Sequence, residues 1–202
     1  MRIVLLTAGL IFSSCSVIIP KLIPFNDLPI PTGKYPVGTQ VFYWEDLNRE
    51  EWFTTEKGDF RKLVVQVWYP ADTAGPVIPY IDHPHIRTGP LARRIELPEF
   101  LLRHIQKVQS NSVLNAEILP SDKVFPLVVF SHGLGGMRMQ NTVQMEELAS
   151  RGYMVVAMDH PFDANVTIFE DGSIAEFRSG LRDGATEDEF WRVRLRWIAL
   201  SR

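Results

Sequence analysis

The stretch FSHGLGG, residues 130–136, combines the residue types best suited to chemistry in this chain of 202 residues. Ser131 is a candidate nucleophile, because a serine hydroxyl can attack an ester once a base has activated it. However, a hydrolase serine that follows a buried strand lies in a G-x-S-x-G turn. Residue 129 is Val, so this pattern fails, and the side chains of the neighbours Ser131 and His132 point apart. We therefore do not expect Ser131 to be a nucleophile.

The glycines after His132 suggest that the backbone, rather than a side chain, does the chemistry here. Acyl transfer puts negative charge on a carbonyl oxygen in its transition state, and one well-placed N–H donor can contribute roughly 3 kcal/mol. Glycine allows a tight turn and a close approach of the substrate to the backbone. The segment 132–136 follows a predicted strand and precedes a predicted helix, as an oxyanion-hole loop does. A plain glycine-rich turn and an anion-binding turn remain alternatives.

Other polar side chains give weaker signals. The remaining histidines are His83, His85, His104 and His160. For His160, in the segment DHPFD at the end of a predicted strand, a role in lining a substrate pocket or a structural hydrogen bond is favoured over general base catalysis. The segment DHPH, residues 82–85, is explained by loop composition, and we predict neither a metal nor another cofactor. Asp159 and Asp163 are expected to cap local structure.

Composition excludes several classes of protein. The chain is 46% hydrophobic and 22% charged, which is typical of a globular domain. A net charge of -3 gives no basic surface for nucleic acid, so no nucleic-acid partner is expected. The single cysteine, Cys15, excludes an internal disulfide framework and a cysteine-rich zinc site.

Residues 1–21 are predicted to be a signal peptide, a lipoprotein signal or a membrane anchor. Arg2 is the only charged residue before Lys21, as in a secretory signal, and the segment IFSSC resembles a lipobox that would carry lipid on Cys15. The uncharged run is also just long enough for a membrane helix. A buried strand or helix is the fourth alternative. We expect a secreted, periplasmic or membrane-attached protein in contact with a membrane, in which a proline-rich linker, residues 22–37, precedes the domain of residues 38–202.

The spacing of apolar residues predicts an α/β domain. Residues 38–46 and 61–70 are rich in aromatic and β-branched residues and are expected to form neighbouring strands. The continuous apolar run 125–130 predicts a strand buried on both faces. A helix over 141–152 and a buried strand over 153–161 follow. A strand, a helix and a strand with short joints predict a parallel crossover.

The segment 72–120 has the weakest pattern, and we interpret it as an insertion. Within it, residues 97–108 place apolar side chains at helical spacing, which predicts a short amphipathic helix. Such a helix would suit a lid that meets lipid, and it would equally suit a cover for the core.

The C-terminal region predicts a hairpin and a last helix. Residues 165–178 alternate around Asp171-Gly172, which favours a tight turn between two strands. Thr186 and Glu189 match a capping box at the start of a helix. That helix carries three apolar side chains on one face: Phe190, Val193 and Trp197.

The run FPLVVFSHGLGG…LASRGYMVVAMDHP resembles the plasma-type platelet-activating factor acetylhydrolases and their bacterial relatives, which are α/β-hydrolases of the serine carboxylesterase kind. The segments PTGKYPVGTQVFYWED and RKLVVQVWYPAD resemble the first strands of that family, and the likeness covers about residues 28–200. It implies an α/β fold, namely a partial α/β-hydrolase with a mostly parallel sheet, flanking helices and an absent C-terminal half.

The same resemblance implies a reaction and a site. The family hydrolyses short or oxidised acyl esters of phospholipids without metal or calcium, so a lipid or small ester substrate and no cofactor are expected. The leucine of its S-H-G-L-G motif donates an oxyanion-hole N–H and corresponds to Leu134, with Gly133 beside it. The remaining residues of the site are expected to line the substrate pocket: His132, Gly135, Gly136 and His160.

One feature of the family is missing, because no G-x-S-x-G occurs in the 202 residues. The triad order in this fold is Ser, Asp or Glu, then His, so all three are expected beyond Arg202. The strand 125–131 would then be an uncovered edge and an aggregation template. Two alternatives follow: a non-catalytic truncated fragment, or a membrane-attached module that binds anions. The second is disfavoured because the loop lacks the Lys-Ser/Thr ending of a phosphate loop.

Overall fold

The computed structural model describes residue 25 and residues 27–122, 124–180 and 184–198. The predictions for residues 1–21, including Cys15, lie outside the described part. Within that part, the chain divides into two compact units: one holds the residues up to Ile30 together with 79–110, and the other holds 31–78 together with 111–198. No helix in the described ranges is long and apolar enough to cross a membrane.

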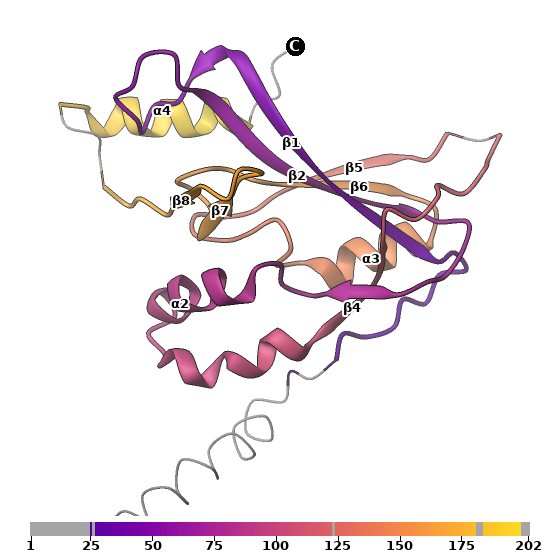
Figure 1. Ribbon diagram of the computed structural model, residues 1–202. Coiled ribbons are helices and arrows are strands. Elements are labelled where there is room, and N and C mark those ends of the chain that lie inside the picture. Colours follow the sequence, from indigo (N-terminus) through magenta and orange to yellow (C-terminus); the bar gives the residue numbers. More distant parts are fainter. Residues whose placement is uncertain (1–24, 26, 123, 181–183, 199–202) are drawn as a thin grey trace, which may run out of the picture. The chain divides into compact units, whose positions relative to one another are not determined.

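The chain contains a six-stranded sheet in the order β3-β4-β1-β2-β6-β5 and a two-stranded sheet formed by β7 and β8 (Figure 1). The strands are β1 (Val37–Glu50), β2 (Phe60–Pro70), β3 (Val77–Pro79), β4 (Gln109–Leu114), β5 (Leu127–Ser131), β6 (Met154–Asp159), β7 (Val166–Ile168) and β8 (Ile174–Glu176). The helices are α2 (Pro84–Arg94), η1 (Glu99–Leu101), η2 (Arg103–Lys107), α3 (Thr142–Ser150) and α4 (Glu187–Ile198).

The four expected main strands are present, and the sheet they form is mixed. β1 pairs antiparallel with β2, and β2 pairs antiparallel with β6. β5 and β6 are parallel and joined through α3, which confirms the predicted strand-helix-strand unit. β4 also runs parallel to β1. The sheet is therefore less uniformly parallel than expected, because the long β1–β2 hairpin supplies antiparallel pairs in its middle.

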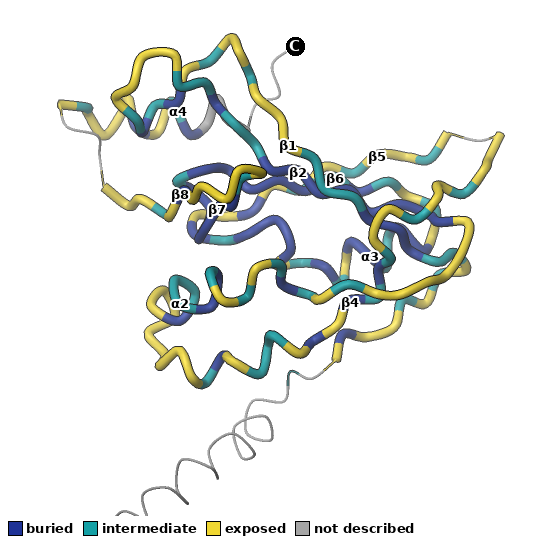
Figure 2. The backbone as a smooth tube through the Cα atoms, viewed as in Figure 1, coloured by how far each residue is buried: buried dark blue, intermediate teal, exposed yellow. Residues whose placement is uncertain are grey.

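The core lies on both faces of β2. On one face, Trp68 packs with Val37 of β1, Met145 of α3 and Val155 of β6. On the other face, Val65 and its neighbours form a second cluster with Met158 of β6. Figure 2 shows β2 and β6 as mostly buried, with intermediate positions near the start of each strand. Burial on both faces explains why β2 has apolar residues at successive positions rather than alternate ones.

β5 lies at the edge of the sheet, as expected, but the prediction that it is buried on both faces is wrong. Leu127 is 62% exposed and Val129 is 45% exposed, whereas Val128 and Phe130 pack against the core that contains Trp68. An apolar run alone does not show how many layers cover a strand. In the described residues, α3 covers one face of this edge and leaves Leu127 and Val129 on the other.

The segment 72–120 contains more regular structure than predicted. It includes β3, α2 and β4, while the expected helix over 97–108 is instead the two short 3₁₀ turns η1 and η2. The apolar side chains predicted to share one face are not buried alike: Leu97 is exposed, Val108 is buried, and the two between them, Leu101 and Ile105, are partly buried. β4 was missed because it is polar. It is held by the buried Glu146, which accepts hydrogen bonds from the Asn111 backbone and the Ser112 hydroxyl.

The C-terminal predictions are confirmed where the structure describes them. β7 and β8 pair antiparallel across the turn that contains Gly172, which has a φ of 81°. At the start of α4, the Glu189 N–H donates to the Thr186 hydroxyl at 3.2 Å, which is one half of the expected capping box. Phe190 is buried and Val193 partly buried. The side chain of Trp197 lies outside the described part.

The chain before β1 lies close to the end of α3, and this contact requires glycine. The Gly33 N–H donates to the Ser150 hydroxyl at 3.1 Å, and a Cβ at Gly33 would lie 2.2 Å from the Ser150 carbonyl oxygen. We expect Gly33→Ala to lower the free energy of unfolding by roughly 1–3 kcal/mol, because the backbone would have to move. Gly180→Ala, where a Cβ meets nothing within 4 Å, is the matched control in urea unfolding. Equal midpoints for the two variants would contradict this expectation.

Candidate functional site

The glycine loop leaves the sheet at the carboxyl end of β5 and is fixed by backbone hydrogen bonds. The Gly136 N–H donates to the Gly133 carbonyl at 2.9 Å, which closes a tight turn. The Gly135 N–H donates to the Asp163 carbonyl at 2.6 Å, and the Asn165 N–H donates to the Gly136 carbonyl at 2.7 Å. Gly135 has a φ of 73°, which favours glycine at this position. The loop is therefore joined to the segment that follows β6.

Leu134, the predicted oxyanion-hole residue, lies in the turn of this loop and outside any helix or strand. Its side chain is 42% exposed, and Gly133 beside it is also exposed. Gly136 is partly buried, and a Cβ there would lie 2.3 Å from the Gln140 side-chain oxygen. Gly133 and Leu134 are therefore exposed residues at the end of the parallel β5–β6 pair. Ligands bind at the carboxyl ends of strands in sheets of this kind.

The structure brings His132 and His160 together beneath the loop. Their rings form an edge-to-face pair with centroids 5.3 Å apart, and both residues are buried. His132 Nδ1 lies 2.7 Å from the Gly133 carbonyl oxygen, and the His160 backbone N–H donates to His132 Nε2 at 3.1 Å. His132 and His160 thus contact each other although 28 positions separate them in the sequence. Sequence spacing alone could not show this, because the contact joins the ends of two strands.

Ser131 lies closer to a histidine than the sequence suggested, and that histidine is not its neighbour. Its hydroxyl is 2.9 Å from His160 Nε2, a contact between the last residue of β5 and the residue after β6. The register of the parallel pair, in which Ser131 lies opposite Met158, explains the approach. His160 Nδ1 is buried without a hydrogen-bond partner. Among the described residues no carboxylate orients the ring through that atom, so the Ser131–His160 pair lacks the third member of a Ser-His-Asp triad there.

Burial controls the charge of His160. Removal of the ring from water, together with the nearby His132 and Arg61, lowers the pKa of His160 from 6.5 to about 3. The ring is therefore neutral near pH 7. A neutral ring can donate to or accept from the Ser131 hydroxyl, and it leaves the region below the glycine loop without an added positive charge.

Asp159 and Asp163 do not cap local structure, contrary to the sequence prediction. Asp159 is fully buried, accepts a hydrogen bond from the Arg138 backbone N–H at 2.7 Å, and forms an ion pair with the Arg138 guanidinium. Asp163 pairs with Arg194 of α4, and burial raises the pKa of the Asp163 carboxyl. Each aspartate thus joins segments distant in the chain. The arginine partners lie so far away in the sequence that residue spacing could not predict these ion pairs.

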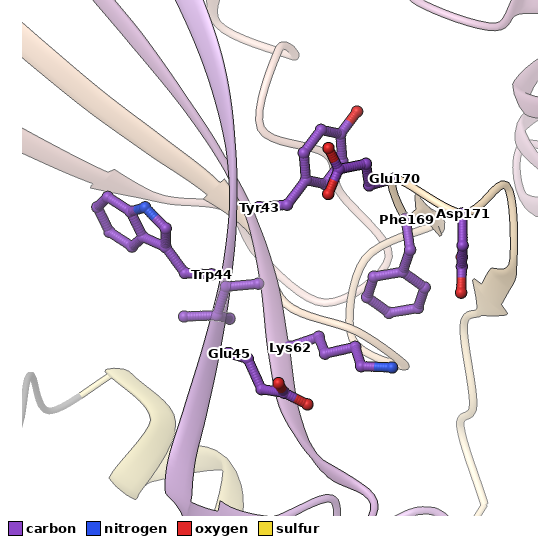
Figure 3. A pocket seen from close by; sticks show the side chains of 8 residues that line it. Tyr43, Trp44, Glu45, Lys62, Phe169, Glu170 and Asp171 are labelled. Carbon is purple, nitrogen blue, oxygen red and sulfur yellow. The ribbon is translucent and has the colours of Figure 1, made fainter.

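The described residues contain no group of three or more histidine, cysteine, aspartate or glutamate side chains that could hold a metal ion. A pocket of about 370 Å³ lies away from the glycine loop, between the β1–β2 hairpin and the turn after β7 (Figure 3). Its labelled side chains include Tyr43, Lys62 and Phe169, and none of the predicted site residues lines it. This pocket is therefore a different place from the site that the sequence predicts.

Similarity to known proteins agrees with the fold. The chain is similar to the solved structure of a ferulic acid esterase from Streptomyces cinnamoneus, with a TM-score of 0.62 and 29% identity over 86% of this chain and 48% of that chain. It is also 46% identical over 46 residues to a platelet-activating factor acetylhydrolase of Gallus gallus, a match that covers 23% of this chain and 11% of that protein. The chain thus spans less than half the length of either relative.

The esterase likeness confirms the expected partial α/β-hydrolase fold. The model of one protein family, described as platelet-activating factor acetylhydrolase, isoform II, matches residues 24–190 of this chain. That range contains β1 to β8 and the whole glycine loop. Because the match covers most of its length, this chain belongs to the isoform II family of platelet-activating factor acetylhydrolases.

Proposed function

We propose that this chain supplies the oxyanion-stabilising part of a carboxylic ester hydrolase. The observation that carries the proposal is the pair of exposed residues Gly133 and Leu134, which lie in a hydrogen-bonded turn at the carboxyl end of β5. An amide held in this way can donate to the negative oxygen that develops in acyl transfer without reorganising during the reaction. Family membership supports the same reaction class.

The proposed substrate is a phospholipid with a short or oxidised acyl chain, or another small ester. In this proposal, the backbone of Leu134 and Gly133 stabilises the oxyanion, while His132, Gly135, Gly136 and His160 surround it. Support comes from the family match and from the position of these residues around one loop. The chemistry requires no metal or other cofactor in the proposal.

The nucleophile is not among the residues to which we assign a role. Ser131 contacts a neutral histidine, but no carboxylate in the described part of the chain orients that histidine, and no G-x-S-x-G occurs in the sequence. We therefore propose that a C-terminal half of the hydrolase domain supplies serine, acid and base, and that the 202-residue chain is inert on esters by itself. The proposed location is secreted, periplasmic or membrane-attached, supported by the nearly uncharged residues 1–21.

A chimera tests this function. Residues 25–202 would be joined to the part of the Streptomyces cinnamoneus esterase chain that the structural match leaves uncovered. We expect the chimera to hydrolyse p-nitrophenyl acetate and Leu134→Pro to lower its kcat by about 10²–10³-fold, because proline has no N–H to donate. Leu134→Ala keeps the N–H and is expected to retain most of the activity.

Circular dichroism and thermal unfolding would show that both Leu134 variants of the chimera fold. Equal activity of the folded Pro and Ala variants would contradict the role of the Leu134 amide. In the 202-residue chain alone, ester turnover that Ser131→Ala abolishes would contradict the statement that the nucleophile lies elsewhere.

A further inference from the structure

We propose that His132 is a positioning residue, which orients the Gly133–Leu134 peptide by donating a hydrogen bond from Nδ1 to the Gly133 carbonyl while it accepts the His160 backbone N–H at Nε2. This inference rests on the proposed function, because it concerns the amide assigned to the oxyanion. It gives His132 a definite tautomer and a task different from lining the substrate pocket.

The two partners of the ring determine its protonation. A carbonyl oxygen can only accept, so the contact of 2.7 Å between His132 Nδ1 and the Gly133 oxygen requires a proton on Nδ1. A backbone N–H can only donate, so the contact of 3.1 Å from the His160 nitrogen requires a lone pair on His132 Nε2. Only the neutral ring with its proton on Nδ1 satisfies both contacts.

The bond to the Gly133 carbonyl also determines where the next amide points. The Gly133 carbonyl and the Leu134 N–H belong to the same planar peptide, and in the trans form they point in opposite directions. The carbonyl accepts from two donors, His132 Nδ1 and the Gly136 N–H at 2.9 Å. A carbonyl with two donors resists rotation of its peptide, so the direction of the Leu134 N–H is maintained.

The ring itself has little freedom to move. His132 is buried, and its ring packs edge to face with the ring of His160. The donor to its Nε2 belongs to the first residue after β6, while His132 is the first residue after β5. The ring therefore connects the ends of two neighbouring parallel strands to the turn. Because of this connection, the orientation of the Gly133–Leu134 peptide depends on the positions of the two strands and not only on the conformation of the glycine loop.

The first test is the tautomer of His132 in the full 202-residue chain, measured by NMR of ¹⁵N-labelled histidine at pH 7. We expect a proton on Nδ1 and none on Nε2. A ring with its proton on Nε2, or a ring protonated on both nitrogens, would overturn the proposal. This measurement needs no variant and no substrate.

The second test follows the direction of the Leu134 N–H by residual dipolar couplings in three variants of the same chain. His132→Asn keeps a donor near the position of Nδ1 and is expected to preserve the Leu134 coupling. His132→Ala removes the donor and is expected to change that coupling while the couplings of β2 and β6 stay the same. His85→Asn, at an exposed histidine, is the control. An unchanged Leu134 coupling in folded His132→Ala would overturn the proposal.

If His132→Ala does not fold, His132→Gln replaces it, because its amide reaches the position of Nε2 and not that of Nδ1. In the chimera, His132→Ala is expected to lower kcat by about 10²-fold with little change in KM, and His132→Asn to restore most of it. Failure of the proposed function would appear separately, as equal activities of Leu134→Pro and Leu134→Ala, while the NMR results would still stand.

Discussion

Asp159→Ala is expected to destabilise this protein more than any other single change considered above. The Asp159 carboxylate is fully buried and pairs with Arg138, whose guanidinium also donates to the Gln66 side-chain oxygen at 3.2 Å. Removal of the carboxylate leaves a buried positive charge without its counter-ion. We expect the free energy of unfolding to fall by about 3–5 kcal/mol, measured by urea unfolding at pH 7.

A matched control exists in the ion pair between Asp188 and Arg192 on α4, which is exposed on both sides. Asp188→Ala removes the same type of carboxylate from the same type of partner, but water screens the charges. We expect a loss of at most about 1 kcal/mol. Comparable losses in the two variants would show that burial of the Asp159 pair has no energetic importance.

His160 is expected to make stability depend on pH. Its pKa is about 3 in the folded protein against an ordinary value of 6.5, so the unfolded chain binds a proton in this interval while the folded chain does not. The contribution of His160 is therefore complete above pH 6.5 and is lost as the pH falls toward 3. Between about pH 7 and pH 4, the loss is on the order of 3 kcal/mol.

The comparison with His160→Gln isolates this contribution from that of the carboxylates. Glutamine places an amide near the position of Nε2, where the Ser131 hydroxyl lies, but it does not titrate. Unfolding free energies of both proteins at several pH values should give a steeper loss in the wild type. Parallel curves would mean that His160 is not kept neutral by burial.

Local patterns were sufficient to predict the elements that carry the loop. The β5–α3–β6 unit and the β7–β8 hairpin each depend on apolar spacing and turn residues that lie within a few positions of one another. The tight turn of the glycine loop was predicted from its glycines in the same way. The structure gives Gly135 the positive φ that such a turn requires.

Contacts between distant segments could not be predicted from these patterns. The Ser131 hydroxyl meets His160 only because β5 and β6 pair in one particular register. β4 has few apolar residues, and its position depends on the carboxylate of Glu146 in α3. The prediction of a helix over 97–108 was wrong because the spacing of apolar residues does not show which of them the rest of the chain buries.

The position of β6 between β2 and β5 has a consequence for the nascent chain. β2 leaves the ribosome long before β6, since β3, α2, β4 and β5 are all synthesised between them. At roughly 5–20 residues per second, this interval is on the order of ten seconds. Until it ends, the β1–β2 hairpin lacks the strand that covers the backbone of Val64 to Trp68. A chaperone that shields extended apolar segments during translation should therefore raise the yield of folded protein.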